Sequence, residues 1–465
     1  MVAISEIKIG NKYVWPIIEG GKGLGVTNGI TAGNFAKCNA IGTFSGANPR
    51  LINEYGEHIP FFTDAVSRME RHVQMIDYAI KAGISQAKLA FDISNGAGMI
   101  NINVLWEMGG AQEVLCGILD GAKGFINGIT CGAGMPYKLA EIASQYSTFY
   151  YPIVSSVRAF RILWKRSYVN FSDWLGGVVY ECPWRAGGHN GLSNAEDPNL
   201  PEDQYPRVLE IRKFMNEIGL EDVPIILAGG VWHINDFAHY LNNKEIGKIA
   251  FQFGTRPIFT KEYPVSMTWK KKLFELKDGD VFLNRFSPTG FYSSAVNNDF
   301  IKELRARSDR QIKFNYEKND EHSIEIFIPS IKKSVYVKSH EDMHKILEYI
   351  QNGFDQAMET EDSRLIFISQ DKKKEILQDR KDCIGCLSAC KFSGWTTHDG
   401  VKIAPDPRSF CIQKTLNNIV DTGDVENNLM FSGKQSFRFK EDSWYKNGEF
   451  MPTIAELIDR IKMGL

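Results

Sequence analysis

The glycine-rich stretch from Glu181 to Gly191 carries the residue types best suited to acid–base chemistry. It reads Glu-Cys-Pro-Trp-Arg-Ala-Gly-Gly-His-Asn-Gly and follows an apolar run from Leu175 to Tyr180, which we predict to be a buried strand. Gly187 and Gly188 lack a Cβ atom, so the backbone there can approach a flat ligand closely. A neutral His189 imidazole beside them can accept a proton near pH 7. We interpret His189 as a catalytic base, with an ordinary loop histidine as the alternative.

A second candidate site is a group of four cysteines in a polar stretch, namely Cys383, Cys386, Cys390 and Cys411. The C-x₂-C-x₃-C spacing lets three thiolates converge on one centre, and a distant fourth thiolate can close the shell. This pattern favours a [4Fe–4S] cluster, although zinc can also bind four thiolates. His398 lies within the intervening loop and is predicted to be exposed rather than a ligand. The remaining cysteines, Cys38, Cys116, Cys131 and Cys182, are scattered and are predicted to be buried thiols.

Two glycine-containing loops within residues 228–256 predict a phosphate-binding site. Ala-Gly-Gly ends at Gly230 and follows one predicted strand, and Gly-Thr-Arg ends at Arg256 and follows the next. Backbone N–H groups of such loops bind phosphate at the last two strands of (β/α)₈ barrels, and Arg256 adds charge. Each glycine pair alone could be a plain turn. Together, Gly229, Gly230, Gly254, Thr255 and Arg256 are predicted to hold the phosphate of a flat cofactor.

The elements that position these residues alternate between short apolar runs and longer amphipathic stretches across residues 1–306. The predicted strands are Trp15–Ile18, Ala40–Thr43, Lys88–Phe91, Ile100–Val104, Gly124–Ile129, Tyr151–Ser155, Gly177–Glu181, Pro224–Ala228 and Lys248–Phe253. The predicted helices are Asp64–Ala82, Pro136–Tyr146, Val157–Ser167, Pro206–Ile218 and Asn235–Asn242. This alternation favours a (β/α)₈ TIM barrel. An open doubly wound sheet is the alternative, but its G-x-G-x-x-G fingerprint is not clearly present.

Three further segments follow the predicted barrel of residues 1–306. Residues 307–378 are dense in charge and are predicted to form a small α+β insert, with strands at Gln311–Tyr316, Ser323–Ile328, Ser334–Val337 and Arg364–Ser369 and a helix at Glu341–Met358. We interpret the insert as a capping or oligomerisation unit, compatible with a homodimer. Residues 379–431 carry the four cysteines. Residues 432–465 end in a helix from Thr453 to about Met463 that is predicted to pack on the barrel.

Composition excludes several classes of function. The formal net charge of −2 at pH 7 gives no sign of nucleic-acid binding. No apolar run approaches the roughly 20 residues that span a bilayer, and the N-terminal stretch MVAISEIKIGNKY is too polar for a signal peptide. We therefore expect a cytoplasmic protein with no membrane partner.

With these motifs in place, residues 13–306 resemble the nitronate monooxygenase / 2-nitropropane dioxygenase family of FMN-dependent (β/α)₈ barrels. The matching pieces are Pro16-Ile-Ile-Glu-Gly-Gly21, Asn103, Gly132-Ala-Gly134, Ala186-Gly-Gly-His189-x-Gly191, Ala228-Gly-Gly230 and Gly254-Thr-Arg256. The resemblance implies that His189 matches the family's catalytic base. It also implies that FMN is held at the glycine-rich strand ends, through Gly20, Gly21, Asn103, Gly132, Ser155, Gly187, Gly188, Gly229, Gly230, Gly254, Thr255, Arg256 and Gly433.

The cysteine run, the Ser-Gly segment at Gly433 and the stretch Ser287-Pro-Thr-Gly290 are similar to one subgroup of that family. This subgroup pairs FMN with a [4Fe–4S] cluster and includes the bacterial acyl-carrier-protein dehydrogenase/isomerase of unsaturated fatty acid synthesis. Two features depart from the pattern. The family usually has Gln and Met in the first glycine loop, where this chain has Glu19 and Lys22, and the interval from Cys390 to Cys411 is longer than in the subgroup.

The predicted activity is that of an FMN-dependent oxidoreductase in which His189 removes an acidic α proton and FMN takes the electrons. The substrate is expected to be an acyl thioester, either a small molecule or bound to acyl carrier protein, and O₂ could reoxidise the flavin. One alternative is a nitronate monooxygenase that uses O₂, and another is an NAD(P)H-dependent enoyl reductase. A non-enzymatic alternative is a flavin or iron–sulfur sensor or scaffold.

Overall fold

The computed structural model describes residues 4–465, so the first three residues of the stretch considered above as a targeting signal lie outside the described residues. Eight parallel strands close into a barrel in the order β10-β12-β13-β3-β4-β7-β8-β9. The barrel strands are β3 (Ile17–Glu19), β4 (Ile41–Ser45), β7 (Met99–Leu105), β8 (Gly128–Gly132), β9 (Phe149–Val154), β10 (Val178–Glu181), β12 (Ile225–Ala228) and β13 (Ile249–Phe253). The predicted (β/α)₈ barrel is confirmed, and the open doubly wound sheet is wrong.

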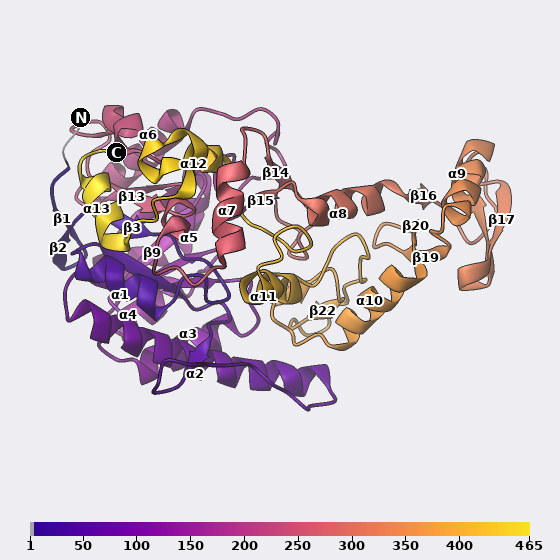
Figure 1. Cartoon of the computed structure of the whole chain (residues 1–465), viewed down its shortest axis with the longest axis horizontal. Helices are drawn as coiled ribbons and strands as arrows, with labels where there is room; N and C mark the ends of the chain where they lie inside the picture. The colour runs from indigo at the N-terminus through magenta and orange to yellow at the C-terminus, as the bar shows by residue number, and fades with distance from the viewer. Residues whose placement is uncertain (1–3) are drawn as a thin grey trace.

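Helices cover the outside of the barrel (Figure 1). They are α1 (Gly29–Lys37), α2 (Arg68–Ser94), α3 (Ala111–Gly121), α4 (Leu139–Gln145), α5 (Val157–Arg166), α6 (Gln204–Glu217) and α7 (Met267–Glu275), with 3₁₀ helices η1 (Tyr168–Trp174), η2 (Ile234–Tyr240) and η3 (Arg256–Phe259). Their starts are defined by local capping. The Asn28 side chain accepts the N–H groups of Ile30 and Thr31 at α1, and Ser67 and Glu70 form a capping box at α2.

One predicted strand, Lys88–Phe91, is wrong because this segment is the last part of α2. Ala87 and Ala90 are both buried against the barrel side of that helix, and the helix continues until Asn95 ends it in the left-handed conformation. A short apolar run cannot be assigned to strand or helix by periodicity alone. The predicted helix Asn235–Asn242 is instead the 3₁₀ helix η2. Among the helices around the barrel, α1, α3 and α7 were not predicted.

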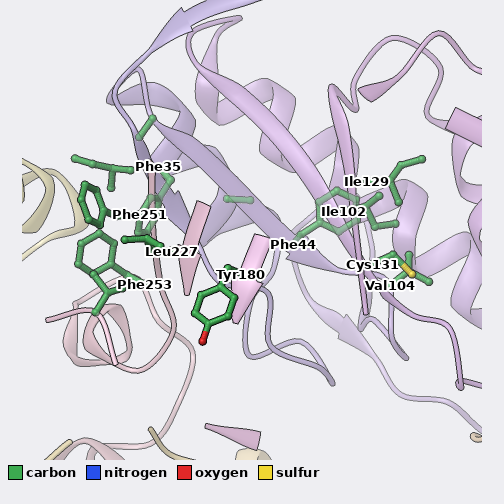
Figure 2. Close-up of a cluster of buried hydrophobic side chains, with 14 of the residues drawn as sticks. Phe35, Phe44, Ile102, Val104, Ile129, Cys131, Tyr180, Leu227, Phe251 and Phe253 are labelled. Atoms are coloured by element: carbon green, nitrogen blue, oxygen red, sulfur yellow. The ribbon is translucent and has the colours of Figure 1, made fainter. Parts of the chain in front are cut away.

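Alternate residues of each strand face opposite sides of the barrel wall, as the period of a strand requires. Outward residues such as Phe44, Ile102 and Phe251 pack under the helices, where Figure 2 shows them in a cluster of buried side chains. Inward residues such as Met99 and Val179 form a second, internal layer. The hairpin of β1 (Ile7–Ile9) and β2 (Lys12–Val14) adds Ile9 and Val14 to this internal layer. The inward positions nearer the carboxyl ends of β4 and β7 are polar: Thr43, Asn101 and Asn103.

Three strands that do not belong to the barrel meet beside its carboxyl end. The strands are β11 (Gly188–His189), β14 (Val281–Asn284) and β15 (Ser293–Val296), and β15 lies between the other two. His189 pairs with Ser293 and Gly188 with Ser294 in an antiparallel register. The glycines around His189 suggest the tip of a free loop, but the backbone of His189 belongs to a sheet.

Residues after β15 extend away from the barrel and return to it, as the orange part of Figure 1 shows. Helix α8 (Asp299–Asp309) leads outward and α10 (Gln370–Lys381) leads back. Between them lie β16 (Gln311–Lys313), β17 (Ile324–Ile328), η4 (Pro329–Ile331), β18 (Lys333–Val337), α9 (His340–Gln351), β19 (Gln356–Glu359) and β20 (Arg364–Ile368). We call residues 311–368 the arm. It has its own buried cluster, which includes Ile328, Val335 and Ile346.

The predicted arm helix Glu341–Met358 is too long, because α9 ends at Gln351. Gly353 adopts a φ of +86°, which a helix cannot contain, and β19 follows. The remaining predicted arm strands overlap β16, β17, β18 and β20. The arm is therefore an α+β unit, as predicted, with one strand more than the sequence indicated.

The chain then returns to the barrel. This last part contains β21 (Ala389–Cys390), β22 (Trp395–Thr396), α11 (Ile412–Thr422), η5 (Lys434–Phe437), α12 (Arg438–Glu441), η6 (Ser443–Gly448) and α13 (Ile454–Lys462), while a small hairpin of β5 (Leu51–Ile52) and β6 (His58–Ile59) lies before α2. The predicted final helix is confirmed as α13. Its apolar face, Ile454, Leu457, Ile458 and Ile461, is fully buried in the outer barrel cluster. Within residues 4–465, no helix combines the length and the apolar composition that crossing a bilayer requires.

Candidate active site

A cavity of about 480 Å³ opens at the carboxyl end of the barrel strands, which is where (β/α)₈ enzymes build their active sites. Its size lies within the range of small-molecule and cofactor sites. Every predicted cofactor residue and His189 contribute to its wall: Gly20, Gly21, Asn103, Gly132, Ser155, Gly187, Gly188, His189, Gly229, Gly230, Gly254, Thr255, Arg256 and Gly433. The structure therefore brings together residues that are spread over more than 400 positions of the sequence.

The missing side chains of two glycines allow this wall to close. A Cβ atom on Gly21 would lie 2.2 Å from Asn103 Cβ, so the first glycine loop can approach β7 only without a side chain. A Cβ atom on Gly187 would lie 2.6 Å from the backbone nitrogen of Gly433. Residues 431–436, which we call the Ser-Gly segment, therefore pack directly on the backbone that precedes His189.

His189 is held by three contacts. Its backbone pairs with Ser293 on β15, its ring packs edge-on against Phe431 at 5.4 Å between ring centres, and its Nε2 atom lies 2.6 Å from Ser287 Oγ. Burial lowers the pKa of His189 to about 4, because a charged imidazolium loses its hydration there. At neutral pH the imidazole is therefore uncharged and able to accept a proton.

The hydroxyl beside His189 belongs to a short polar chain. Ser287 Oγ lies 2.9 Å from Thr289 Oγ1, and Ser287 itself is only 2% exposed. With Nε2–H donating to Ser287 and Ser287 donating to Thr289, the lone pair of a neutral imidazole is left on Nδ1. The sequence singled out the Ser287–Gly290 stretch as a resemblance but did not assign Ser287 to the site.

A second ionisable residue that the sequence did not assign is Glu181, at the carboxyl end of β10. It lines the same cavity as His189, since the inward register of Val179 is repeated two residues later. Burial raises the pKa of Glu181 to about 8. The cavity thus contains a base whose pKa lies below neutrality and an acid whose pKa lies above it, the pattern that assigns acid and base roles.

Some predicted cofactor residues already have partners within the protein. The Ser155 hydroxyl donates to the Gly191 carbonyl at 2.7 Å, and the Thr255 hydroxyl accepts the Gly433 N–H at 3.0 Å. The buried Arg256 guanidinium donates to the carbonyls of Trp232 at 2.5 Å and Leu465 at 3.0 Å. The Arg256 guanidinium therefore braces the chain at this part of the cavity wall.

The end of β3 and the glycine loop after it carry Glu19 and Lys22, the two residues that depart from the family pattern. Glu19 is fully buried on the outward side of β3, where its carboxylate accepts the Tyr263 hydroxyl at 2.5 Å and the Thr43 N–H at 2.9 Å. Burial raises the pKa of Glu19. Lys22 lines the cavity, and burial lowers its pKa to about 8.

The four cysteines of the second candidate site come together in one place. Cys390 is buried in a hydrophobic cluster against which Cys383, Cys386 and Cys411 pack. The pKa of the Cys386 thiol is raised well above its usual value, first by burial and then by the other three sulfur atoms. Among residues 4–465, however, no group of three or more His, Cys, Asp or Glu side chains stands in a metal-binding arrangement. His398 is exposed, as predicted.

The four-cysteine segment is joined to the loop that carries Ser287. The Lys391 N–H donates to the Pro288 carbonyl at 2.9 Å, and the Ser409 hydroxyl donates to the Phe286 carbonyl at 2.7 Å. On its other side the Gly109 N–H donates to the Cys386 carbonyl at 2.9 Å. The segment thus connects the loop after β7 with the residues around His189.

Comparison with known proteins identifies relatives of this architecture. The sequence model of the nitronate monooxygenase family matches residues 119–373. FabK from Thermotoga maritima has a similar structure, with a TM-score of 0.53, 14% identity, and coverage of 98% of this chain and 93% of FabK. The enoyl reductase domain of MlnA from Bacillus amyloliquefaciens is similar at a TM-score of 0.50 and 13% identity, over 97% of this chain and 93% of that domain. At these identities the likeness shows the fold alone. No curated protein sequence matches the chain significantly.

Proposed function

Because the chain belongs to the nitronate monooxygenase family of FMN-dependent oxidoreductases, we propose that His189 removes an acidic α proton from an acyl thioester. The observation that carries this proposal is an uncharged, oriented imidazole in the wall of a flavin-sized cavity. When bound, FMN supplies the acceptor for the electrons that leave the substrate carbon. The protein supplies the base, the orientation and the exclusion of water.

The cavity wall suits FMN in two respects. Glycine backbone from β3, β10, β12 and β13 lines it, so that a flat ring can approach the wall without meeting side chains. Gly254 has open space where its Cβ atom would be. We propose that Gly229, Gly230, Gly254 and Gly433 contact the FMN phosphate and that Asn103 and the first glycine loop contact its ring.

Glu181 is the second group that the proposed reaction uses. Loss of an α proton moves negative charge onto the thioester carbonyl oxygen. A carboxylic acid that is still protonated at neutral pH can donate a hydrogen bond to such an oxygen in a buried site. We propose that Glu181 has this role and that His189 and Glu181 act from the same wall of the cavity.

We also propose that Cys383, Cys386, Cys390 and Cys411 hold a [4Fe–4S] cluster, as their types and convergence suit four-thiolate ligation. Small movements of the thiols would be needed, since the side chains do not stand in ligand positions. The expected role is structural, because this segment anchors the Ser287 loop. Iron and acid-labile sulfide analysis of anaerobically purified protein tests this, and zinc in place of iron would contradict it.

Nitronate oxidation is the second candidate, favoured by the family match itself. It requires the same base and cofactor but a nitro group in place of the thioester. FabK and the MlnA domain are similar to this chain over nearly its whole length. The MlnA domain is an enoyl reductase, so acyl chemistry is the class to test first.

The decisive experiment is a substrate panel on the FMN-loaded protein under air and without air. Saturated and unsaturated acyl thioesters, free and on acyl carrier protein, are compared with alkyl nitronates and with enoyl thioesters plus NADPH. Flavin bleaching by an acyl thioester without air, abolished in His189→Ala but with the flavin spectrum retained, is the expected result. Turnover of nitronates with no response to any thioester would refute the acyl proposal.

A further inference from the structure

We propose that Lys22 is a flavin-tuning residue whose ammonium group stabilises the negative charge of reduced FMN, and that Glu19 behind it moderates that effect. The inference depends on FMN in this cavity but not on the substrate proposed above. Three observations support it: the position of Lys22 in the cavity wall, the packing of its loop, and the buried carboxylate of Glu19 nearby.

The first observation is the environment of the ammonium group. Lys22 lines the cavity, and its Nζ donates to the Gly20 carbonyl at 2.6 Å. Among residues 4–465 this is its one hydrogen bond, although an ammonium group has three N–H donors. Nζ also lies 5.1 Å from the centre of the Tyr263 ring, on whose face a cation is favoured. The loop itself is rigid, because Thr27 bonds both the Lys22 N–H and its carbonyl.

The second observation is the packing of the loop that carries this cation. The glycines of the proposed phosphate site follow β12 and β13. The first glycine loop lies between these glycines and β7: Gly20 packs on Phe253 and Gly254, and Gly21 meets Asn103 of β7. Lys22 follows Gly21, and we infer that its ammonium group acts on the flat ring rather than on the phosphate. Interactions of a charge with a buried partner are stronger in the cavity than in water.

The third observation is the counter-charge. Glu19 is fully buried three residues before Lys22 and is held by Tyr263 and Thr43. It lies within electrostatic reach of Lys22, although the two side chains form no direct ion pair among those identified in residues 4–465. The ammonium group and the two hydrogen bonds that Glu19 accepts favour its ionised form against the effect of burial. We infer that the ionised carboxylate partly cancels the field of the ammonium group in the cavity. The two residues should thus act on bound flavin with opposite signs.

The test uses the FMN-loaded protein and two readouts that do not depend on turnover. Sulfite adds to the flavin ring to give an anionic adduct, so its dissociation constant reports the stabilisation of negative charge. The flavin midpoint potential reports the same property directly. For Lys22→Met we expect about tenfold weaker sulfite binding and a potential lower by about 30 mV, the shift that equals tenfold for a two-electron couple. For Glu19→Gln we expect both readouts to move in the opposite direction.

Lys22→Arg is the matched variant that keeps the charge, and it should restore most of the sulfite affinity. FMN content and the thermal midpoint of each variant show whether the site is intact. If Lys22→Met loses FMN, then Glu19→Gln and Lys22→Arg still test the sign of the effect. A Lys22→Met protein with weaker FMN binding but unchanged sulfite affinity and potential would overturn the proposal, because Lys22 would then be a phosphate contact. Shifts of the same sign in Lys22→Met and Glu19→Gln would also overturn it.

Discussion

At the scale of single residues, two ionisable groups in the cavity wall have pKa values on opposite sides of neutrality. The pKa of His189 is lowered to about 4 and that of Glu181 is raised to about 8, both by burial. A base must be uncharged to accept a proton, and an acid must be protonated to donate a hydrogen bond. Both conditions are met together between these two values.

The first prediction is therefore a bell-shaped dependence of kcat/KM on pH. Activity should rise as pH increases through about 4, where His189 loses its proton, and fall as pH increases through about 8, where Glu181 loses its own. Glu181→Gln should remove the alkaline limb. Lys22 also titrates near pH 8, and Glu19 and Tyr263 lie against it, so Lys22→Met serves as the control. An alkaline limb that persists in Glu181→Gln but vanishes in Lys22→Met would contradict the assignment.

The second prediction concerns Ser287, which touches His189 and positions it. Ser287→Ala removes the 2.6 Å contact to Nε2, and we expect kcat to fall by about tenfold, the equivalent of one hydrogen bond of ~1.5 kcal/mol. KM should change little, because the loop is still anchored through Pro288 and Phe286.

Two variants control this experiment. Thr289→Val removes the far end of the polar chain and should have a smaller effect on kcat than Ser287→Ala. Ser287→Thr keeps a hydroxyl group and should recover part of the lost rate. Equal losses in Ser287→Ala and Thr289→Val, with no recovery in Ser287→Thr, would show that the loop supports the fold rather than the imidazole.

At the scale of elements, the Ser-Gly segment is joined to the loop before His189 at Gly187. The third prediction is that Gly187→Ala displaces this segment, because the new Cβ atom would meet backbone atoms of Ser432 and Gly433 at 2.6 Å. Backbone cannot yield as a flexible side chain does. We expect FMN affinity to fall by at least about tenfold, a loss of ~1.4 kcal/mol, with the ring of Phe431 no longer packed on His189.

Flavin fluorescence titration gives the FMN affinity of Gly187→Ala, and circular dichroism gives its thermal midpoint. The matched control for thermal stability is Gly254→Ala, since a Cβ atom at Gly254 has open space around it; it does not control FMN affinity, because Gly254 is itself a proposed phosphate contact. The Gly187→Ala protein should lose more thermal stability than the Gly254→Ala protein. If only Gly254→Ala were destabilised, the packing of the Ser-Gly segment on Gly187 would not be required for the fold.

Elements also show what the sequence could predict. The strand–helix alternation and the glycine clusters predicted the barrel. The proposed cofactor residues other than Gly433 line one cavity because parallel strands place their carboxyl ends together. The stretch Lys88–Phe91 was ambiguous, because three apolar residues after a lysine fit either period and only the continuation of α2 settles the assignment.

The site residues that the sequence analysis did not assign depend on contacts between distant segments, which the local sequence pattern does not reveal. Ser287 lies 98 residues from His189 along the chain, and β11 and β15 bring the two together. Glu181 resembles any strand-end carboxylate until its inward register and burial are known. Arg256 was assigned to the phosphate from its neighbours, whereas its guanidinium group bonds the Trp232 and Leu465 carbonyls.

At the scale of the whole molecule, the arm is separable from the barrel. None of its residues lines the cavity, and its buried cluster is distinct from that of the barrel. Figure 1 shows it extended away from the other elements. Two ion pairs connect it to the four-cysteine segment, Glu361 with Lys391 at 2.7 Å and Asp362 with Arg408 at 2.8 Å. Arg408 also donates to Gln311 at 3.2 Å, and Met358 and Ile368 pack in the cluster that contains Cys390. Exposed or partly exposed ion pairs of this kind contribute little stability, about 0–1 kcal/mol each.

The fourth prediction is that the arm can be excised without loss of the flavin site. Lys313 and Arg364 are paired neighbours on β16 and β20, so a short glycine-containing turn can join them in place of residues 314–363. Ile312, Leu365 and Phe367 would lose their buried partners and are changed to Thr in the same variant. The shortened protein should keep its FMN content and its kcat for a free acyl thioester within about twofold. The two weak ion pairs contribute at most ~2 kcal/mol of stability, Met358 is lost only from the partly buried edge of its cluster, and neither change touches His189.

The excised protein also distinguishes two roles of the arm. If the arm only caps the four-cysteine segment, substrates free and bound to acyl carrier protein should be affected equally, and thermal stability should fall slightly. If the arm docks a carrier protein, KM should rise for the carrier-bound substrate alone. A double variant, Glu361→Gln with Asp362→Asn, is the control, since it removes both ion pairs and leaves the arm in place. Loss of FMN or of iron from the excised protein but not from this control would contradict the separation of arm and barrel, because it would show that the arm core supports the site.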